Sequence, residues 1–389
     1  MSPARASLFL LVIIYLGYIS LGLPDGTLGI AWPEMHTSLG LPIGMAGAIM
    51  IVVTILAATS GFSSGGVVAR FSTGPVVFGS CFLTASGLMI IAHAQNLAWL
   101  LVAAIPLGLG AGAVDAGANG FVARHYSGRH MNWLHACWGI GASCGPLVMG
   151  RAITIGAGWR GGFFTLACVQ LFLAILFLLT LPLWKRVPER KRVADCTHRA
   201  RRVPIMLANS PAGWLSVTIF GLYVAVETTT GLWAGSILVV SRGISLEHAA
   251  VCVAAFYGSI TGGRILVGFV VERWGNRRLV AFGTALAILG AIAFAFAFTA
   301  PLAGLALVLL GLGFAPIYPC LMHEVPQRFA PDAVQTVIGR QSGAGSIGAG
   351  ALPAAAGTLA QFSLESISWV VIAGVVVMLT AIRRLDRLT

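Results

Sequence analysis

Charged side chains are scarce in this 389-residue sequence. Lysine and arginine contribute 24 residues, aspartate and glutamate contribute 12, and together they make up 9% of the chain, while 58% of the residues are hydrophobic. Soluble domains carry about 25% charged residues, so a water-soluble globule of this length would lack the polar side chains to cover its surface. The composition excludes cytosolic enzymes, secreted scaffolds and nucleic-acid binders, and it predicts a protein that crosses a membrane many times.

Cysteine patterns typical of metal sites are also missing. The seven cysteines form no C-x-x-C pair, and none combines with a histidine at metal-ligand spacing. Six of them lie in apolar segments, where a free thiol behaves as a small hydrophobic group. We therefore expect no metal and no organic cofactor.

Positive charges outnumber negative ones, and the formal net charge is +12. In a soluble protein this excess would indicate a nucleic-acid partner. Here the cations lie in short segments between apolar runs, so we expect the lipid bilayer, and no nucleic acid, as the partner of this surface.

Twelve apolar segments are long enough to cross a bilayer, which takes about 20 residues each. The first of them follows Arg5 but is not followed by a small-residue cleavage site and a polar chain, so we interpret it as a retained helix and not as a signal peptide. The predicted fold class is all-α and integral to the membrane. The expected spans cover residues 8–31, 43–68, 76–94, 98–122, 131–155, 161–184, 212–240, 248–270, 279–299, 302–324, 333–360 and 366–382.

Lysine and arginine are unevenly distributed between the expected spans. With the N-terminus in the cytoplasm, nineteen of them fall in cytoplasmic segments, and two, Arg160 and Arg242, fall in outer loops. Cytoplasmic loops carry the excess of positive charge in membrane proteins. We therefore expect a multi-pass protein of the cell (inner) membrane with both termini in the cytoplasm.

The sequence contains an internal repeat. Landmark residues of the first half recur about 203 residues later, in similar local sequences, which predicts two pseudo-symmetric bundles of six helices. The pairs are Asp25 and Glu227, Arg70 and Arg273, Gly108 and Gly311, and Pro146 and Pro353. The expected organisation is a first bundle over 1–184, a cytoplasmic basic linker over 185–211 and a second bundle over 212–389. The linker is either a solvated connection or a site for anionic lipid head groups.

One loop carries a signature. Residues 268–278 read Gly-Phe-Val-Val-Glu-Arg-Trp-Gly-Asn-Arg-Arg, which resembles the G-x-x-x-[DE]-R-x-G-x-R-R motif of the major facilitator superfamily. The first-half copy, at 65–75, departs from the motif because Ala69 replaces the acid. The resemblance implies a transporter of twelve helices whose two bundles open alternately to each side of the membrane. It also implies that the protein is a monomer. It also implies that Glu272, Arg273, Arg277 and Arg278 act at the cytoplasmic gate.

Three further stretches are similar to the fucose-permease-like branch of that superfamily, which includes proton- and sodium-coupled sugar carriers. They are Gly22-x-x-Asp25-Gly26-x-x-Gly29-x-x-Trp32-Pro33, Asp115-x-x-x-Asn119, and Leu134-His135 followed by Gly139-Ile-Gly141-Ala-x-x-Gly145-Pro146. The resemblance implies that the acid of the fourth helix, Asp115, takes part in ion coupling.

Three acids lie within expected spans, where a charge is costly and calls for a reason. They are Asp25, Asp115 and Glu227. A carboxylate in an apolar cavity can load and release a proton near neutral pH, so we expect these residues to couple transport to protons, or to sodium. The alternative is that they form structural ion pairs with the three arginines of the spans, Arg151, Arg264 and Arg340.

Polar and aromatic side chains near these acids are candidates for solute binding. Asn119 shares a helix face with Asp115 at i+4, and His135 and Trp138 are three residues apart. Tyr223 lies one turn before Glu227, and Tyr318 is the repeat partner of Asp115. Aromatic rings that stack while their hydroxyls form hydrogen bonds suit sugars, although buried histidines and aromatics also occur as packing residues and interface anchors. Glu324 is a plausible partner for Arg340.

The expected function is symport of a small, polar, sugar-like solute with protons. Two alternatives remain: export of drugs or metabolites in exchange for protons, and a membrane sensor or lipid-handling protein that transports nothing. No enzyme is expected, because the nucleophile-like and dinucleotide-like glycine patterns of the sequence lie inside spans, where glycines serve helix packing.

Overall fold

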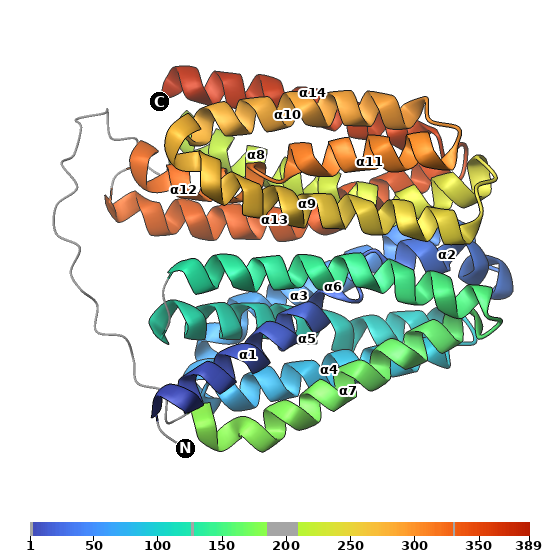
Figure 1. Cartoon of the computed structure of the whole chain (residues 1–389), viewed down its shortest axis with the longest axis horizontal. Coiled ribbons are helices and arrows are strands. Elements are labelled where there is room, and N and C mark those ends of the chain that lie inside the picture. The colour runs from blue at the N-terminus through green and yellow to red at the C-terminus, as the bar shows by residue number, and fades with distance from the viewer. Residues whose placement is uncertain (1–2, 126–127, 185–208, 330) are drawn as a thin grey trace. The chain divides into compact units, whose positions relative to one another are not determined.

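The computed structural model describes residues 3–125, 128–184, 209–329 and 331–389 (Figure 1). Inside its helices, the side chains of 3–6, 62, 64–66, 69, 113–120, 123–125, 128–129, 131–132, 326 and 331–336 are not among those described. The described residues are almost entirely helical, which confirms the all-α fold class. The helices are α1 Pro3–Gly22, α2 Thr27–Ser38, α3 Met45–Phe71, α4 Thr73–Ala92, α5 Leu97–His125, α6 Gly128–Thr154, α7 Gly158–Trp184, α8 Pro211–Ser236, η1 Ile237–Ser241, α9 Leu246–Trp274, α10 Asn276–Ala295, α11 Ala300–Phe314, α12 Ile317–Arg328, α13 Pro331–Ala360 and α14 Ser366–Leu388.

Each expected span corresponds to one of these helices or to two consecutive ones, so twelve spans cross the membrane. Within the described residues, eight helical segments are long and apolar enough to do so by length and composition alone, and Met45–Gly61 and Leu97–Gly112 form shorter apolar stretches. The remaining two helices, α6 and α13, are richer in glycine and polar residues, as expected for helices that pack tightly on their neighbours.

Three spans differ from the uninterrupted α-helices that hydropathy predicts. The first is broken between α1 and α2 at Leu23–Gly26, where Gly26 adopts the left-handed region with a φ of 70°. The tenth is broken between α11 and α12 at Ala315–Pro316, because Pro316 cannot continue the hydrogen-bond ladder. The seventh continues beyond α8 as the π-helical turn η1, Ile237–Ser241.

The chain divides into two compact units, which we call unit 1 (Met1–Arg192) and unit 2 (Val193–Thr389). The helix pairs that pack inside unit 1 recur inside unit 2. In unit 1, α1 packs on α6 and α7, α3 on α5, and α4 on α5 and α7. In unit 2 the corresponding pairs are α8 with α13 and α14, α9 with α11, and α10 with α11 and α14. The sequence repeat is therefore a repeat of packing.

Glycines at repeat-related positions make equivalent close approaches. A Cβ added to Gly108 would lie 2.5 Å from the carbonyl oxygen of Val53, and one added to Gly311 would lie 2.5 Å from that of Phe256. Val53 and Phe256 are 203 residues apart, the same separation as Gly108 and Gly311. Close backbone contact between helices requires small residues, so the repeat preserves the glycines for a packing reason.

The α1–α6 and α8–α13 contacts follow the same rule. A Cβ on Gly141 would overlap the carbonyl oxygen of Ile19, and one on Gly348 would overlap that of Gly221. Gly141 and Gly348 are separated by 207 residues, as are Pro146 and Pro353. This larger separation indicates a small insertion between Gly311 and Gly348.

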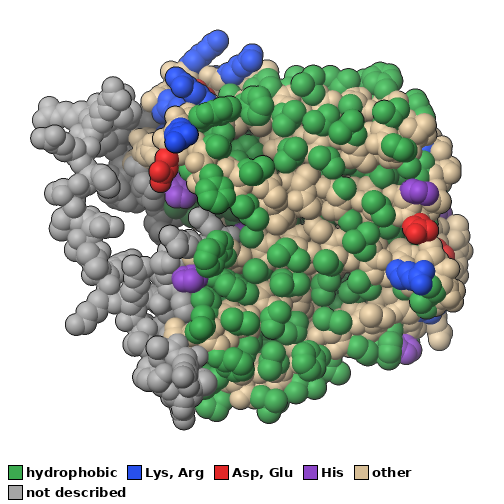
Figure 2. Space-filling model, viewed as in Figure 1, with side chains coloured by type: hydrophobic (Ala, Val, Ile, Leu, Met, Phe, Trp, Pro, Cys, Tyr) green, Lys and Arg blue, Asp and Glu red, His purple; other side chains and the backbone are tan. Residues whose placement is uncertain are grey.

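Large hydrophobic side chains are exposed along the outside of the helices, as a lipid-facing surface requires. Leu179 is 72% exposed and Phe269 is 78% exposed. Figure 2 shows that hydrophobic side chains cover much of the face in view, while lysine and arginine side chains of the described residues gather toward the ends of the helices.

Candidate functional site

Unit 1 presents an acid at the break in its first span. Asp25 lies in the turn between α1 and α2, where its backbone N–H donates to the carbonyl oxygen of Gly22 at 3.0 Å. Its carboxylate accepts a hydrogen bond of 2.7 Å from Nε1 of Trp138 on α6. The carboxylate also lies just before the N-terminus of α2, where the helix dipole favours negative charge. The break thus places a partly buried, hydrogen-bonded carboxylate within the span.

Small residues bring α6 close enough for this contact. A Cβ on Gly22 would overlap the carbonyl oxygen of Trp138, and one on Gly145 would overlap that of Leu23. Because the two backbones touch, the Trp138 indole reaches Asp25 directly. The structure therefore brings together two of the residues that the sequence predicts for the site.

His135 lies nearer the start of α6 than Trp138. Its ring meets the ring of Tyr18 on α1 edge-on, with the centroids 6.1 Å apart. Tyr18 is buried, and His135 is partly exposed. Asp115 and Asn119 lie in the helical part of α5, but their side chains are outside the described residues, so their predicted roles stay predictions.

Unit 2 presents its acid in a different setting. Glu227 on α8 is 8% exposed, and its Oε2 lies 3.9 Å from Nη2 of Arg264 on α9. The same Nη2 donates a hydrogen bond of 3.2 Å to the hydroxyl of Tyr223, one helical turn before Glu227. The long carboxylate–guanidinium distance indicates a loose ion pair, which the hydroxyl of Tyr223 helps to hold.

An aromatic wall adjoins this acid. The Arg264 guanidinium carbon lies 5.7 Å from the ring centre of Tyr318 on α12, and the rings of Tyr318 and Tyr223 are 6.3 Å apart. Tyr223 is fully buried, whereas Tyr318 is partly exposed. A charged pair beside an accessible aromatic ring can bind a solute that offers hydroxyl groups on one side and an apolar face on the other.

Arg264 belongs to this cluster, whereas the sequence indicates for it only a structural ion pair with one of the acids of the spans. A cation inside a span requires a partner, and that is the signal by which the sequence could have identified Arg264 as a site residue.

A contact that the sequence does not reveal joins Tyr15 on α1 to His130 on α6, where the Tyr15 hydroxyl lies 2.8 Å from Nδ1. No local pattern connects these two residues, because 115 positions separate them.

The predicted gate residues lie in different surroundings, and their role at a gate stays a prediction. Glu272, Arg273 and Arg278 are exposed, whereas Arg277 is bound: its Nε lies 3.1 Å from Oε2 of Glu324 on α12. The suggested partner of Glu324 is wrong. The structure places Arg277 and Arg328 against it, and the guanidinium of Arg340 lies 4.7 Å from the ring centre of Trp214 instead.

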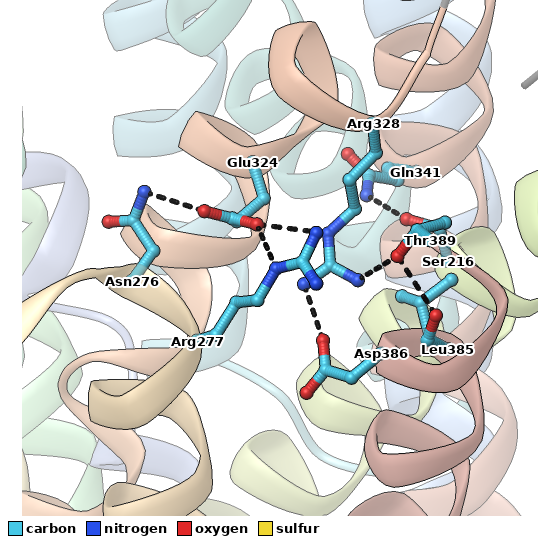
Figure 3. A network of polar contacts seen from close by, with 9 residues as sticks. All are labelled: Ser216, Asn276, Arg277, Glu324, Arg328, Gln341, Leu385, Asp386 and Thr389. Carbon is cyan, nitrogen blue, oxygen red and sulfur yellow. Dashed lines mark hydrogen bonds and ion pairs between the residues drawn. The ribbon is translucent and has the colours of Figure 1, made fainter. Parts of the chain in front are cut away.

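Figure 3 shows the network around Glu324. Arg328 is the centre: its Nε lies 3.1 Å from Glu324, its Nη2 donates to Asp386 on α14 at 2.7 Å, and its Nη1 donates to Thr389 at 2.9 Å. Asn276 also donates to Glu324, at 3.1 Å. Arg328 and Glu324 are nearly buried, so the network ties α10, α12 and α14 together at one end of unit 2.

A second ion pair closes the opposite end of unit 2. Arg242, directly after η1, holds Glu365 at the start of α14 by two hydrogen bonds of 2.9 and 2.6 Å. Partial burial raises the pKa of Glu365, but the hydrogen bonds from Arg242 and Ser241 and the charge of Arg242 outweigh it, so the pKa lies below its ordinary value. The Arg242 guanidinium also lies 4.6 Å from the ring centre of Phe294.

Comparison with known proteins places this arrangement in a family. A model described as Major Facilitator Superfamily matches residues 14–353. The chain belongs to this superfamily. The helix pattern and the family match show a multi-pass membrane protein of a superfamily of transporters.

Among curated relatives, the chain is 25% identical over 261 residues to the glucose/mannose transporter GlcP of Bacillus subtilis (strain 168), which covers 64% of this chain and 63% of the relative. The chain therefore matches less than two thirds of that relative's length. Two solved structures share the fold. A bacterial homologue of the human lysosomal transporter Spinster, inward-facing and occupied, matches with a TM-score of 0.79 at 15% identity, covering 100% of this chain and 98% of the other. A point mutant of the nucleoside transporter NupG matches with a TM-score of 0.76 at 16% identity, covering 98% of this chain and 99% of the other.

Proposed function

We propose that this transporter carries a small, polar, sugar-like solute together with protons, by alternating access. We further propose that it works as a monomer in the cell (inner) membrane with both termini in the cytoplasm. Twelve spans and the family set the coarse function, while the solute and the coupling ion are inferred from the two acids and their neighbours.

The observation that carries the proposal is the cluster of Glu227, Arg264, Tyr223 and Tyr318. Glu227 is nearly buried, yet it lies 3.9 Å from its cation, so a proton can neutralise it without destroying a tight ion pair. Neutralisation would free Arg264 to donate hydrogen bonds to solute hydroxyls. Binding of the proton and binding of the solute would then favour each other, which is what symport requires.

Asp25 supports the same mechanism from unit 1. Its carboxylate accepts a hydrogen bond from an indole N–H, which is a neutral donor. An ionised carboxylate inside a span raises the cost of reorientation, and a proton removes that cost. Asp115 is proposed as the third acid, and Asn119, His135 and Trp138 as further solute contacts. The name of the curated relative, a glucose/mannose transporter, favours a monosaccharide as the first solute to test.

The test uses purified protein in liposomes with an imposed inward proton gradient and a panel of labelled monosaccharides. We expect at least one sugar to be concentrated, and we expect its addition without a gradient to acidify the lumen. Acidification identifies symport, while alkalinisation of the lumen would identify exchange and contradict the proposal.

Three variants test the acids: Asp25→Asn, Asp115→Asn and Glu227→Gln. Each removes the proton-accepting charge at almost constant volume, so gradient-driven accumulation should fall to the level set by the sugar gradient alone. Glu247→Gln is the matched control, because Glu247 is exposed in the first turn of α9. The proposal fails if no sugar is concentrated, or if all three acid variants accumulate sugar as well as the control does.

A further inference from the structure

We propose that the interface between α1 and α6 of unit 1 carries a proton-release path from Asp25 to the end of the unit where both helices begin. The path deepens the proposed function and rests on its proton coupling. It assigns a role to Tyr15 and His130, which no residue pattern of the sequence marks.

Three contacts step along this interface. Each contact joins one residue of α1, or of the turn after it, to one residue of α6. Each contact includes a carboxyl or an imidazole group, which can hold or pass a proton. The pairs are Asp25 with Trp138 at 2.7 Å, Tyr18 with His135 at 6.1 Å between ring centroids, and Tyr15 with His130 at 2.8 Å.

The order of the pairs shows that the contacts form a line. Residues 15, 18 and 25 pair with 130, 135 and 138, so both helices advance in the same direction along the interface. An α-helix rises 1.5 Å per residue, so His130 and Trp138 are about 12 Å apart along α6. The line therefore connects a carboxylate at the helix break to the starting end of the unit.

The chemistry of the pairs suits proton transfer. A neutral imidazole accepts a proton at one ring nitrogen and releases another from the second, and a phenol accepts and donates through the same oxygen. The proton that leaves the Asp25 carboxyl is taken up at one nitrogen of His135. His130 lies five residues before His135, about 7.5 Å along the helix, so in this proposal a water molecule carries the proton that His135 releases to His130. The Tyr15 hydroxyl, hydrogen-bonded to His130, orients the imidazole that returns a proton to solution. Each imidazole ends the transfer neutral but in the other tautomer, and a ring flip or proton exchange with water restores the first tautomer, so no charge accumulates.

The burial of the side chains along the proposed path is consistent with proton transfer. Tyr18 is buried, whereas Tyr15, His130 and His135 are only partly buried, so the groups that exchange protons are not sealed inside unit 1. Tyr18 then serves to fix the ring of His135.

Unit 2 shows that packing does not require these groups. With the repeat separations of 202 for α1 and 207 for α6, Tyr15, Tyr18, His130 and His135 correspond to Val217, Phe220, Val337 and Ser342. Val217, Phe220 and Val337 are buried hydrophobic residues. The α8–α13 contact thus has apolar side chains at three of these four positions, and its polar contact is a different one, the hydrogen bond of 3.0 Å from Gln341 to Ser216. Packing of these helices does not require the phenol–imidazole pairs of unit 1, and we assign those pairs a function.

The experiment separates proton release from solute binding by measuring two kinds of uptake in proteoliposomes. Gradient-driven uptake requires net proton movement in every cycle. Counterflow of labelled sugar against preloaded unlabelled sugar requires none. The variants are Tyr15→Phe and His130→Gln, at positions that take no part in the proposed solute contacts, and His93→Gln is the control, because His93 is exposed at the end of α4 and bonds its own helix.

We expect both variants to slow gradient-driven uptake at least about tenfold, since positioned acid–base groups contribute about 10²–10⁴-fold and water replaces part of the loss. Counterflow should stay at the wild-type rate, and His93→Gln should change neither measurement. Elution of each variant as a single species on size exclusion establishes that it is folded.

Three results would overturn the path. If driven uptake survives both substitutions while Asp25→Asn abolishes it, the path is wrong and the proposed function stands. If the variants lose counterflow as well, the contacts serve structure or solute binding. If wild-type uptake ignores the proton gradient, the proposed function itself fails and the path with it.

Discussion

The two units pack alike but carry different polar chemistry. Gly108 and Gly311 approach equivalent backbone atoms, so the same helices meet in the same way. The acids, however, are held differently: Asp25 accepts from an indole, whereas Glu227 lies beside a guanidinium. Backbone contacts between helices fix the architecture of each half, and the side chains around the acids are free to diverge without disturbing it.

The ends of the units differ in the same manner. Glu324, in the charged network of unit 2, corresponds by the repeat separation of 203 to Phe121 in unit 1. Phe121 is buried and packs against Trp184 with the ring centroids 4.6 Å apart. At this pair of repeat-related positions unit 1 packs aromatic rings and unit 2 holds a charged network, which predicts different responses to substitution.

The largest effect is expected where the units are alike. Gly141→Val and Gly348→Val each force a side chain against a backbone carbonyl that cannot move aside, so we expect a loss of about 3 kcal/mol or more and aggregation during purification. Gly79→Val is the control, because a Cβ there meets nothing within 4 Å. Thermal unfolding and size exclusion measure the result. Tolerance of one variant but not the other would show that the shared contacts are unequal.

Next in size is the network of unit 2. Glu324→Ala leaves the nearly buried Arg328 with one carboxylate partner fewer. Because Asp386 still pairs with Arg328, the loss should stay below the about 3–5 kcal/mol that breaking a buried ion pair costs. Glu272→Ala, at an exposed acid near the end of α9, should cost little. The melting temperature of the purified protein tests this. Equal melting temperatures for the two variants would contradict the structural role assigned to Glu324.

A smaller effect is expected at the acid of unit 1. Trp138→Phe removes a hydrogen bond to a carboxylate, a contact that contributes about 1.5–3 kcal/mol. Gradient-driven uptake should fall about tenfold, because roughly 1.4 kcal/mol corresponds to a factor of ten. Trp99→Phe, at an exposed position of α5, is the control. Unchanged uptake in Trp138→Phe would remove the indole from the site.

The smallest effect concerns Arg242 and Glu365. Because the pKa of Glu365 is lowered in the folded protein, its stabilising contribution is present above the unfolded pKa and disappears as the pH falls through the folded pKa. Glu365→Gln should lower the melting temperature slightly at pH 7, and the difference from wild type should vanish in acid. The effect is small because the carboxylate is about a third exposed to solvent. A difference that persists unchanged in acid would contradict the assignment.

Much of the fold follows from the sequence, because hydropathy and the repeat act over whole helices. Twelve spans and their pairing into halves are confirmed by the structure and the family match. The breaks at Leu23–Gly26 and Ala315–Pro316 are not predicted by hydropathy. Both carry Gly or Pro signals, but each lies within an apolar run long enough to read as one span.

Part of the candidate site can likewise be predicted from the sequence, and part cannot. Helix spacing and the repeat select Tyr223, Glu227 and Tyr318, and the structure brings them together around Arg264. The partner of Glu324 cannot be chosen from the sequence, because several arginines are available in unit 2. They are Arg277, Arg328 and Arg340, and only the first two contact Glu324. The direction of each side chain decides between them, and that direction depends on how α12 packs.

The contact between Trp138 and Asp25 also has an optical consequence. Indole emission responds to the charge of a group bonded to its ring nitrogen, so loading Asp25 with a proton alters the fluorescence of one tryptophan out of ten. In a variant whose other nine tryptophans are replaced, the emission of Trp138 would report the protonation of Asp25 in real time, without an added dye.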